Sequence, residues 1–383
     1  WQDVISQSIL SSEDGYRSAV GVFGGREEQG RTDHPQNDLA RWQGGIRAQY
    51  LAPDGQADVL VGHQEKDFGA NGYYGTLPEW PAEERVEDTL VAAVARYRGA
   101  GEDYLRAAAS WRVLYDEYTL VAGPVLYENS HRSQASAISI DGRTGLGKSG
   151  SVNWRATGEA EDIESERLGN HDRQRADVLL LPGWHRGSVD LFAGARGFDL
   201  EDESPFFLPQ ASCEVKAGKA HRIFASWSGS VREPSFTELN YESPGSLGNS
   251  GLRWQEAKTS EVGWRWLGRG AGDCRVAMFH TRTTHSVDWV KTLPDDPRWV
   301  ATDLGTLDTW GAEGRGRYRF GTALSLDVSY TWLRRDDVDG IYAGRYVLDY
   351  PEQVARIGWD WQVTRSVIIR GSQAWRQQDT SPL

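Results

Sequence analysis

The amino-acid sequence predicts an all-β protein, a transmembrane antiparallel β-barrel, and three observations carry the prediction. The chain is rich in glycine (43 residues) and tryptophan (17) and poor in methionine (1), a composition that favours strands and turns over helices. Apolar and polar residues alternate with a period of two along many segments. These segments are often about 12 residues or longer, whereas strands of soluble proteins have about five or six.

Alternation and turn residues together predict about eighteen strands. They span residues 1–11, 16–28, 39–51, 56–67, 85–98, 102–117, 133–145, 147–160, 170–183, 186–199, 206–216, 219–232, 252–267, 272–288, 299–317, 320–334, 345–359 and 362–376. In 219–232 the odd positions are mostly apolar, while most even positions carry hydroxyls or charges. A tilted strand that crosses a bilayer needs about 9–11 residues, so the predicted strands are long enough to span one.

The predicted connections alternate between short and long. Tight turns are expected at 14–15, 53–55, 99–101, 145–147, 182–183 and 268–272. Longer loops are expected at 29–38, 68–84, 118–132, 161–169, 233–251, 289–298 and 335–344. Short turns at one rim and long loops at the other are typical of an outer-membrane barrel.

The physical chemistry of lipid explains why such a sheet has to close. An edge strand exposed to lipid leaves amides unsatisfied at several kcal/mol each. A charge on the lipid face costs roughly 2–4 kcal/mol at the bilayer midplane. Arg106, Arg112 and Arg222 alternate with the apolar residues of their strands, so we expect them on the opposite, watery face.

Composition and motifs exclude several classes of protein. A net charge of −13 argues against a nucleic-acid partner, which favours a basic surface. Cys213 and Cys274 lie apart and lack the neighbours of a zinc site. The sequence contains no zinc-protease, serine-hydrolase or phosphate-loop motif. We therefore expect neither an enzyme nor a cofactor.

Two segments resemble the TonB-dependent outer-membrane receptors. The first is KDFGANGYYG at Lys66–Gly75, which is similar to a segment of cobalamin-type receptors. The second is REPSFTELNY at Arg232–Tyr241, followed by Gly248-Asn249, which resembles a strand–loop–strand junction common in the family. Glu233, Ser250 and Trp254 depart from the usual family residues there.

The resemblance implies a 22-strand barrel that surrounds an N-terminal plug domain. Eighteen strands counted from the second would leave the plug, the first strand and the last few strands outside residues 1–383, so we expect an incomplete barrel portion with the plug domain absent. The resemblance also implies an outer-membrane location in a Gram-negative-type bacterium, contact with lipid, a monomer, and TonB as a partner through the plug.

Ligand contacts are expected in the long loops, where a receptor presents aromatic and hydrogen-bonding groups to a solute. The candidates are Tyr73, Tyr74, Trp80, Tyr127, His131, Phe236 and Tyr241. Phe236 and Tyr241 belong to the family motif, which occurs in receptors for different ligands. Asp336, Asp337 and Asp339 form an acidic loop, which we expect to be a solvated surface loop. The weaker alternative is a calcium site, because the loop offers the oxygen ligands that calcium prefers.

The sequence thus favours a receptor that imports a scarce nutrient, such as a cobalamin or a ferric siderophore, at the expense of energy delivered by TonB. Two alternatives remain open at this point. One is a passive outer-membrane porin without a plug. The other is a soluble carbohydrate-binding β-protein, which would be monodisperse without detergent.

Overall fold

The structure of the protein is a computed structural model. It describes residues 2–11 (backbone only), 16–30, 38–71, 80–200, 204–243, 245–268, 270, 272–338, 340–341 and 343–378. Contacts divide the chain into two units, each described by itself below. The first unit contains Trp1–Leu180, Gly197–Phe207 and Asn240–Gly245, and the second contains Leu181–Arg196, Leu208–Leu239 and Ser246–Leu383.

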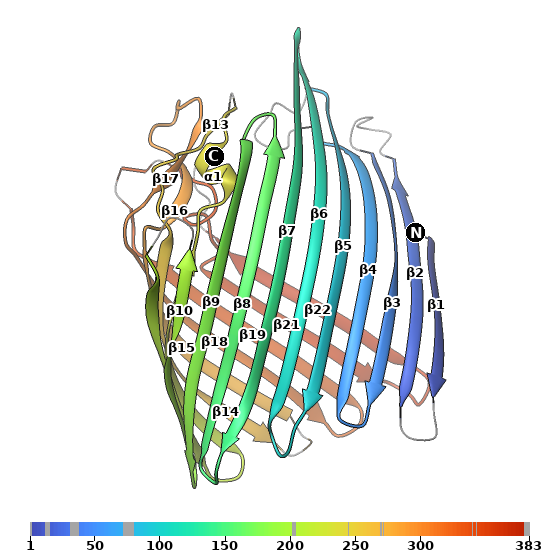
Figure 1. The fold of residues 1–383 in the computed structure, drawn as a ribbon, viewed down its shortest axis with the longest axis vertical. Helices are drawn as coiled ribbons and strands as arrows, with labels where there is room; N and C mark the ends of the chain where they lie inside the picture. Colours follow the sequence, from blue (N-terminus) through green and yellow to red (C-terminus); the bar gives the residue numbers. More distant parts are fainter. Residues whose placement is uncertain are drawn as a thin grey trace. The chain divides into compact units, whose positions relative to one another are not determined.

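The first unit is a run of long strands that lie side by side (Figure 1). Each of the first eight strands pairs antiparallel with the next along the chain. They are β1 (Gln2–Ser11), β2 (Arg17–Gln29), β3 (Leu39–Ala52), β4 (Gly55–Gly69), β5 (Ala82–Arg98), β6 (Tyr104–Ala122), β7 (Val125–Leu146) and β8 (Gly150–Ser165). The strands β9 (Gly169–Arg186) and β10 (Val189–Leu200) contribute residues to both units.

The second unit continues the same antiparallel order. Its long strands are β11 (Phe206–Ala217), whose first two residues belong to the first unit, β12 (His221–Arg232), β14 (Gln255–Gly268), β15 (Gly272–Thr284), β18 (Leu307–Phe320), β19 (Leu324–Arg335), β21 (Gln353–Gln362) and β22 (Ile368–Gln377). The shorter elements are α1 (Phe236–Asn240), β13 (Ser246–Leu247), β16 (Val287–Lys291), β17 (Trp299–Asp303) and β20 (Ala343–Gly344). Among the described residues the long strands form one 18-stranded sheet, which confirms the predicted strand number.

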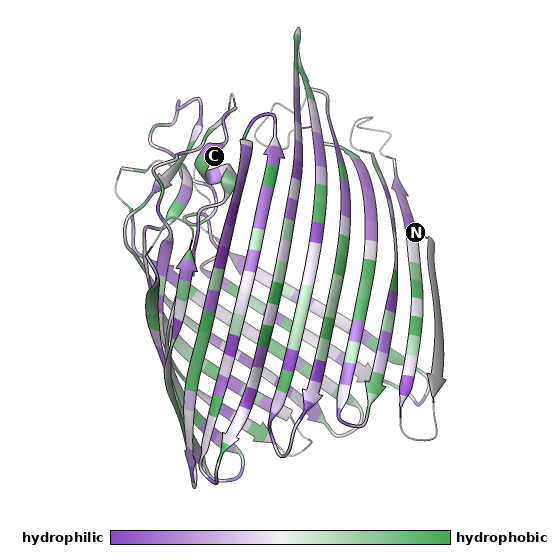
Figure 2. Cartoon of the chain, in the orientation of Figure 1, coloured by the Kyte–Doolittle hydropathy of each residue, from purple (hydrophilic) through white to green (hydrophobic). Residues whose placement is uncertain are grey.

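One face of the strands in each unit is apolar and yet exposed. In the first unit this face carries Val22, Ile46, Val61, Trp111 and Ile138, and in the second it carries Ile223, Trp264, Val276, Val328 and Ile357. Green and purple segments alternate along the strands in Figure 2, as the period of two requires. An exposed apolar surface of this extent marks contact with a membrane or partner.

The other face carries ion pairs, as predicted for Arg106 and Arg112. Arg106 Nη2 lies 2.7 Å from Asp141, and Arg112 Nη2 lies 2.8 Å from Asp88. In the second unit Arg222 Nε lies 3.6 Å from Glu214. A partly buried charge is costly unless it has a partner of opposite charge. These ion pairs therefore allow charged side chains to lie on this face.

The loop predicted at 118–132 is wrong. β6 runs on to Ala122 and β7 begins at Val125, so only Gly123 and Pro124 form the turn. Gly123 has a φ of 63°, a conformation that glycine adopts without steric cost. The segment was rich in aromatic and polar residues, but its β-branched and aromatic positions also suit a strand.

The tight turn predicted at 182–183 is also wrong, since both residues lie inside β9. The turn lies at Gly187, whose φ of 60° provides the left-handed geometry. The loop predicted at 161–169 shrinks to residues 166–168. The strands predicted at 272–288 and 299–317 each divide in two, and 345–359 becomes a strand only from Gln353 onward, because the hydrophobic runs there extend into a separate small sheet of β13, β17, β16 and β20.

No helix in the described part of the chain is long and apolar enough to cross a membrane.

Candidate ligand-binding site

The hairpin of β6 and β7 extends beyond the exposed apolar face. β6 has 19 residues and β7 has 22, about twice the length that a tilted strand needs to cross a bilayer. On the apolar face of β6, Leu105, Trp111 and Tyr115 are exposed, and Glu117 follows at the next position. Because a charge on the lipid face is costly, we infer that the membrane-facing part of β6 ends near Tyr115.

Beyond that point, the opposite face of the first unit holds a small buried cluster, which we call the rim cluster. Its centre consists of Ala70, Ala82, Tyr118 and Leu120, and Phe68, Trp80 and Tyr127 pack against it. The Tyr118 and Tyr127 rings lie 6.2 Å apart in an edge-to-face arrangement. Aromatic pairs of this geometry contribute about 0.5–1.5 kcal/mol beyond the area that they bury.

Hydrogen bonds hold the start and end of the connection between β4 and β5 to the rim cluster. Ala70 donates its amide to the Ala82 carbonyl at 2.7 Å. Asn71 Oδ1 accepts the Ala82 amide at 2.7 Å. These bonds join the residues just before 72–79 to Ala82, which lies two residues after Trp80. They help to hold Trp80 against the rim cluster.

Tyr127 joins the cluster to the segment that follows α1. The hydroxyls of Tyr127 and Tyr241 lie 3.4 Å apart, and the Arg167 guanidinium lies 4.7 Å from the Tyr127 ring centroid. Burial and the contact with Tyr241 raise the pKa of Tyr127 above its ordinary value. The Tyr127 hydroxyl therefore stays protonated at neutral pH.

A polar row lies beside the aromatic residues. His131 Nε2 lies 2.7 Å from Asn129 Nδ2, and its Nδ1 lies 2.7 Å from Ser165 Oγ. Ser165 Oγ already accepts the amides of Arg167 and Leu168, so its own proton is free for the imidazole. Burial lowers the pKa of His131, and the ring is accordingly neutral at pH 7.

Asp116 faces His131 across the β6–β7 pair. Burial, with a smaller contribution from the nearby charge of Glu84, raises the pKa of Asp116 to about 6, and the charge of Lys66 opposes the shift. Asp116 Oδ1 is buried and makes no hydrogen bond to the described residues. The rim cluster and the polar residues beside it thus combine an aromatic surface, a neutral imidazole and a carboxyl group that titrates near physiological pH.

The structure brings three of the seven predicted ligand residues together: Trp80, Tyr127 and Tyr241. His131 lies four residues after Tyr127 on β7 and bonds to Asn129 and Ser165 instead. Tyr127 and His131 lie in β7 rather than in a loop. Tyr73 and Tyr74 lie outside the described residues. Phe236 belongs to α1 in the second unit. Asp116, Glu84 and Lys66 were missed, because in sequence they are ordinary charged positions of amphipathic strands.

The family motif forms a compact helix cap in the second unit. Arg232 Nη2 donates to both oxygens of Glu238, at 2.9 and 2.8 Å. The Ser235 amide and hydroxyl donate to Glu238 Oε2, while the Glu238 amide donates to Ser235 Oγ. This reciprocal Ser–Glu pair is a capping box. It assigns the motif a structural role, as expected of a segment shared by receptors with different ligands.

The predicted calcium loop finds no support in the described residues. Asp336 and Asp337 follow β19, and Asp339 lies outside the described residues. No three His, Cys, Asp or Glu side chains within the described ranges are grouped so that they could hold a metal ion.

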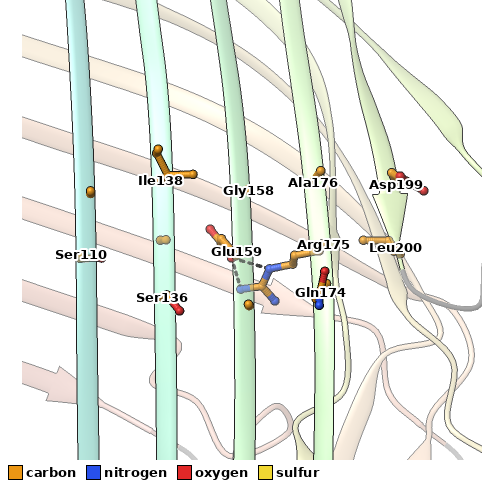
Figure 3. Close-up of a pocket in the computed structure, with 13 residues that line it drawn as sticks. Ser110, Ser136, Ile138, Gly158, Glu159, Gln174, Arg175, Ala176, Asp199 and Leu200 are labelled. Carbon is orange, nitrogen blue, oxygen red and sulfur yellow. Dashed lines mark hydrogen bonds and ion pairs between the residues drawn. The ribbon is translucent and has the colours of Figure 1, made fainter.

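A shallow pocket of about 850 Å³ lies in the first unit across β6–β10 (Figure 3). Glu159 and Arg175 point toward one another there and form an ion pair. Arg175 also contacts Glu161 at 3.1 Å, and Arg173 contacts Glu161 at 2.6 Å. Because these charges satisfy one another, the pocket is a weaker ligand candidate than the rim cluster.

Residues 25–382 match the family model for the TonB-dependent receptor-like β-barrel. The chain belongs to this family. The match confirms the predicted fold class and the resemblance noted in the sequence. Membership of this receptor barrel family also implies an outer-membrane protein.

Solved structures of receptors share the fold at low sequence identity. The siderophore receptor PirA from Pseudomonas aeruginosa superposes with a TM-score of 0.64 at 12% identity, over 98% of this chain and 71% of that one. The FrpB iron transporter from Neisseria meningitidis gives 0.70 at 12%, over 97% and 66%. The ferripyoverdine receptor of P. aeruginosa, bound to ferripyoverdine, gives 0.70 at 12%, over 98% and 60%. No curated protein matches the sequence.

Proposed function

We propose that this chain is the barrel portion of a TonB-dependent receptor that imports a scarce nutrient, with a ferric siderophore as the first candidate and a cobalamin as the second. The family match over residues 25–382 carries the proposal. Structural neighbours that are named as siderophore receptors and iron transporters favour iron, while the KDFGANGYYG segment is the reason to keep cobalamin. The chain spans 60–71% of the three receptors described above.

We further propose that residues 1–383 supply the wall of the barrel and that a plug domain provides the TonB contact. In this scheme the rim cluster meets the solute at the outer face, and a Gram-negative-type outer membrane surrounds the apolar face. The barrel supplies a satisfied hydrogen-bond network in lipid, and the energy for release comes from TonB. Nothing in this mechanism requires an enzymatic step.

Uptake in the source bacterium tests the function. A strain that lacks the gene and its complemented parent are grown under iron limitation and supplied with radiolabelled ferric siderophores, or with labelled cyanocobalamin. We expect deletion to lower accumulation of one of these solutes at least tenfold, and loss of TonB to have the same effect. Uptake that persists without TonB but disappears with the gene would indicate a passive porin instead.

A further inference from the structure

The second unit also contains a small sheet of four short strands, β13, β17, β16 and β20. We call this sheet the platform. β16 pairs antiparallel with β17 and with β20, and β13 pairs with β17. Val290, Ala301 and Ala343 are almost completely buried within it. The side chains that project from this sheet are therefore held by a packed core, although the segments are connections between barrel strands.

Asp288 locks the segment after β20 onto β16. Its side chain is 2% exposed, and its carboxylate accepts the amides of Trp289 at 2.8 Å and of Tyr346, Val347 and Leu348 at 3.0 Å. The Arg345 amide also donates to the Trp289 carbonyl at 3.0 Å. Hydrogen bonds to a carboxylate are among the stronger ones in proteins. The backbone of Arg345 is therefore held in place beside β16.

Two cations share the ring of Trp299. Lys291 Nζ lies 5.4 Å and Arg345 Cζ lies 5.7 Å from its centroid. Arg345 also lies 5.7 Å from the centroid of Tyr346, which is 62% exposed. A cation over an indole face is stabilised by about 0.5–1 kcal/mol at exposed sites, but two like charges near one ring also repel each other.

Acidic groups lie near the two cations, but none in the described part of the chain forms a close ion pair with them. Neither Lys291 nor Arg345 has a carboxylate oxygen of the described residues within 4.0 Å. Asp288 is occupied by four amides. Asp296 has its pKa held below the ordinary value mainly by the Leu293 amide and Thr292 hydroxyl, with the charge of Lys291 as a lesser cause.

We propose that Lys291, Trp299 and Arg345 bind a flat aromatic anion, with the negative group between the two cations and the ring against the indole and Tyr346. The inference deepens the proposed import function and rests on it, since it assigns an aryl anion to the solute. The preformed platform lowers the entropic cost of binding, because the side chains are already gathered. The positive charge selects the anion, and the aromatic faces select a planar group.

Binding of phthalate to the full chain, refolded in a non-ionic detergent, tests the proposal by calorimetry or saturation-transfer NMR. Dimethyl phthalate is the neutral control, succinate the non-aromatic dianion, and inorganic phosphate the arm for lipid-type phosphate groups. Lys291→Gln and Arg345→Gln each remove one cation, and Trp299→Leu removes the ring. Arg319→Gln is the matched control, because it removes an arginine charge elsewhere in the same unit. Far-UV circular dichroism checks that each variant is folded.

We expect phthalate to bind at millimolar concentration or below, and the two charge variants to weaken it about fivefold to tenfold, which corresponds to about 1–1.4 kcal/mol. Trp299→Leu should weaken phthalate more than succinate, and Arg319→Gln should change nothing. The proposal is overturned if phthalate does not bind by 10 mM, if the neutral ester or phosphate binds as well as phthalate, or if folded charge variants bind like the parent. These outcomes concern binding alone, so they are independent of whether the uptake test succeeds.

Discussion

Asp116 and His131 lie directly opposite each other on β6 and β7, next to Tyr115, where we infer that the membrane-facing part of β6 ends. Burial shifts the pKa values of both groups toward their neutral forms, upward to about 6 for Asp116 and downward for His131. The outer end of the first unit therefore contains ionisable groups that carry less charge at neutral pH than their types would suggest.

Asp116→Asn should stabilise the protein at alkaline pH. The pKa of Asp116 is raised in the folded protein, so folding favours the protonated acid, and this contribution is lost as the pH rises from about 4 through about 6. The variant cannot ionise, and we expect a gain of about 1–3 kcal/mol at pH 8 that vanishes at pH 4. Thermal unfolding of the parent and the variant in detergent, between pH 4 and pH 8, measures this difference in stability.

The neighbouring charges define the control for that experiment. Glu84 and Lys66 act on Asp116 in opposite directions, while Glu117 lies on the other face of β6 and is exposed. Glu117→Gln removes the same charge and should show no such pH dependence. An Asp116→Asn variant whose stability parallels that of the parent at every pH would contradict the assigned burial effect.

Ile138→Lys tests whether the exposed apolar face meets lipid. Ile138 is 66% exposed, so a lysine there would be nearly neutral in a water-soluble protein. In a bilayer the same change should cost about 2–4 kcal/mol. Ser139→Lys places the charge on the opposite face of β7 and should cost less. Folding titrations into lipid vesicles compare the two, and equal costs would favour the soluble alternative.

Glu238→Gln should loosen the family motif. Glu238 is 8% exposed, and its carboxylate joins Arg232 to the Ser235 cap. An amide cannot accept all of these bonds, so we expect a loss of about 2–3 kcal/mol. Ser235→Ala removes only part of the cap and should cost about 1 kcal/mol. Limited proteolysis should reveal faster cleavage within 233–251 for Glu238→Gln, with Ser235→Ala intermediate; unchanged cleavage would argue against the capping role.

Asp288→Asn should release the segment after β20. One carboxylate oxygen would become an NH₂ group that faces amide donors, and about two hydrogen bonds would be lost. Hydrogen exchange measured by mass spectrometry should accelerate at least tenfold in residues 345–348, equivalent to about 1.4 kcal/mol. Asp295→Asn makes the same charge change on an exposed residue between β16 and β17 and should leave this exchange rate unaltered.

Alternation was sufficient to predict most of the long strands, because a period-two pattern depends only on which residues face lipid and which face water. The alternation failed to locate strand ends where a longer or shorter strand would show the same alternation. The β6–β7 hairpin continues through Tyr127 and His131 because strands can extend beyond the bilayer and still pair, and no composition rule marks where the lipid ends. Pro182-Gly183 resembles a turn, yet the left-handed glycine lies at Gly187.

The sequence predicted which types of residue would form the candidate site, but not which of them lie close together. Trp80, Tyr127 and Tyr241 are separated by long stretches of sequence, and only the tertiary fold places them together. Asp116 acquires its functional interest from burial beside Glu84, which no single segment of the sequence reveals. Lys291, Trp299 and Arg345 converge for the same reason, since they come from β16, from β17 and from the segment that follows β20.

The sequence by itself determined the strands, their two faces and the receptor family, because local alternation and short motifs encode these properties. The tertiary structure alone decided which loop residues are really strand residues, which charges are buried, and which cations share one aromatic ring. Those features depend on contacts between residues distant in the chain, and contacts of that kind leave no periodic trace in the sequence.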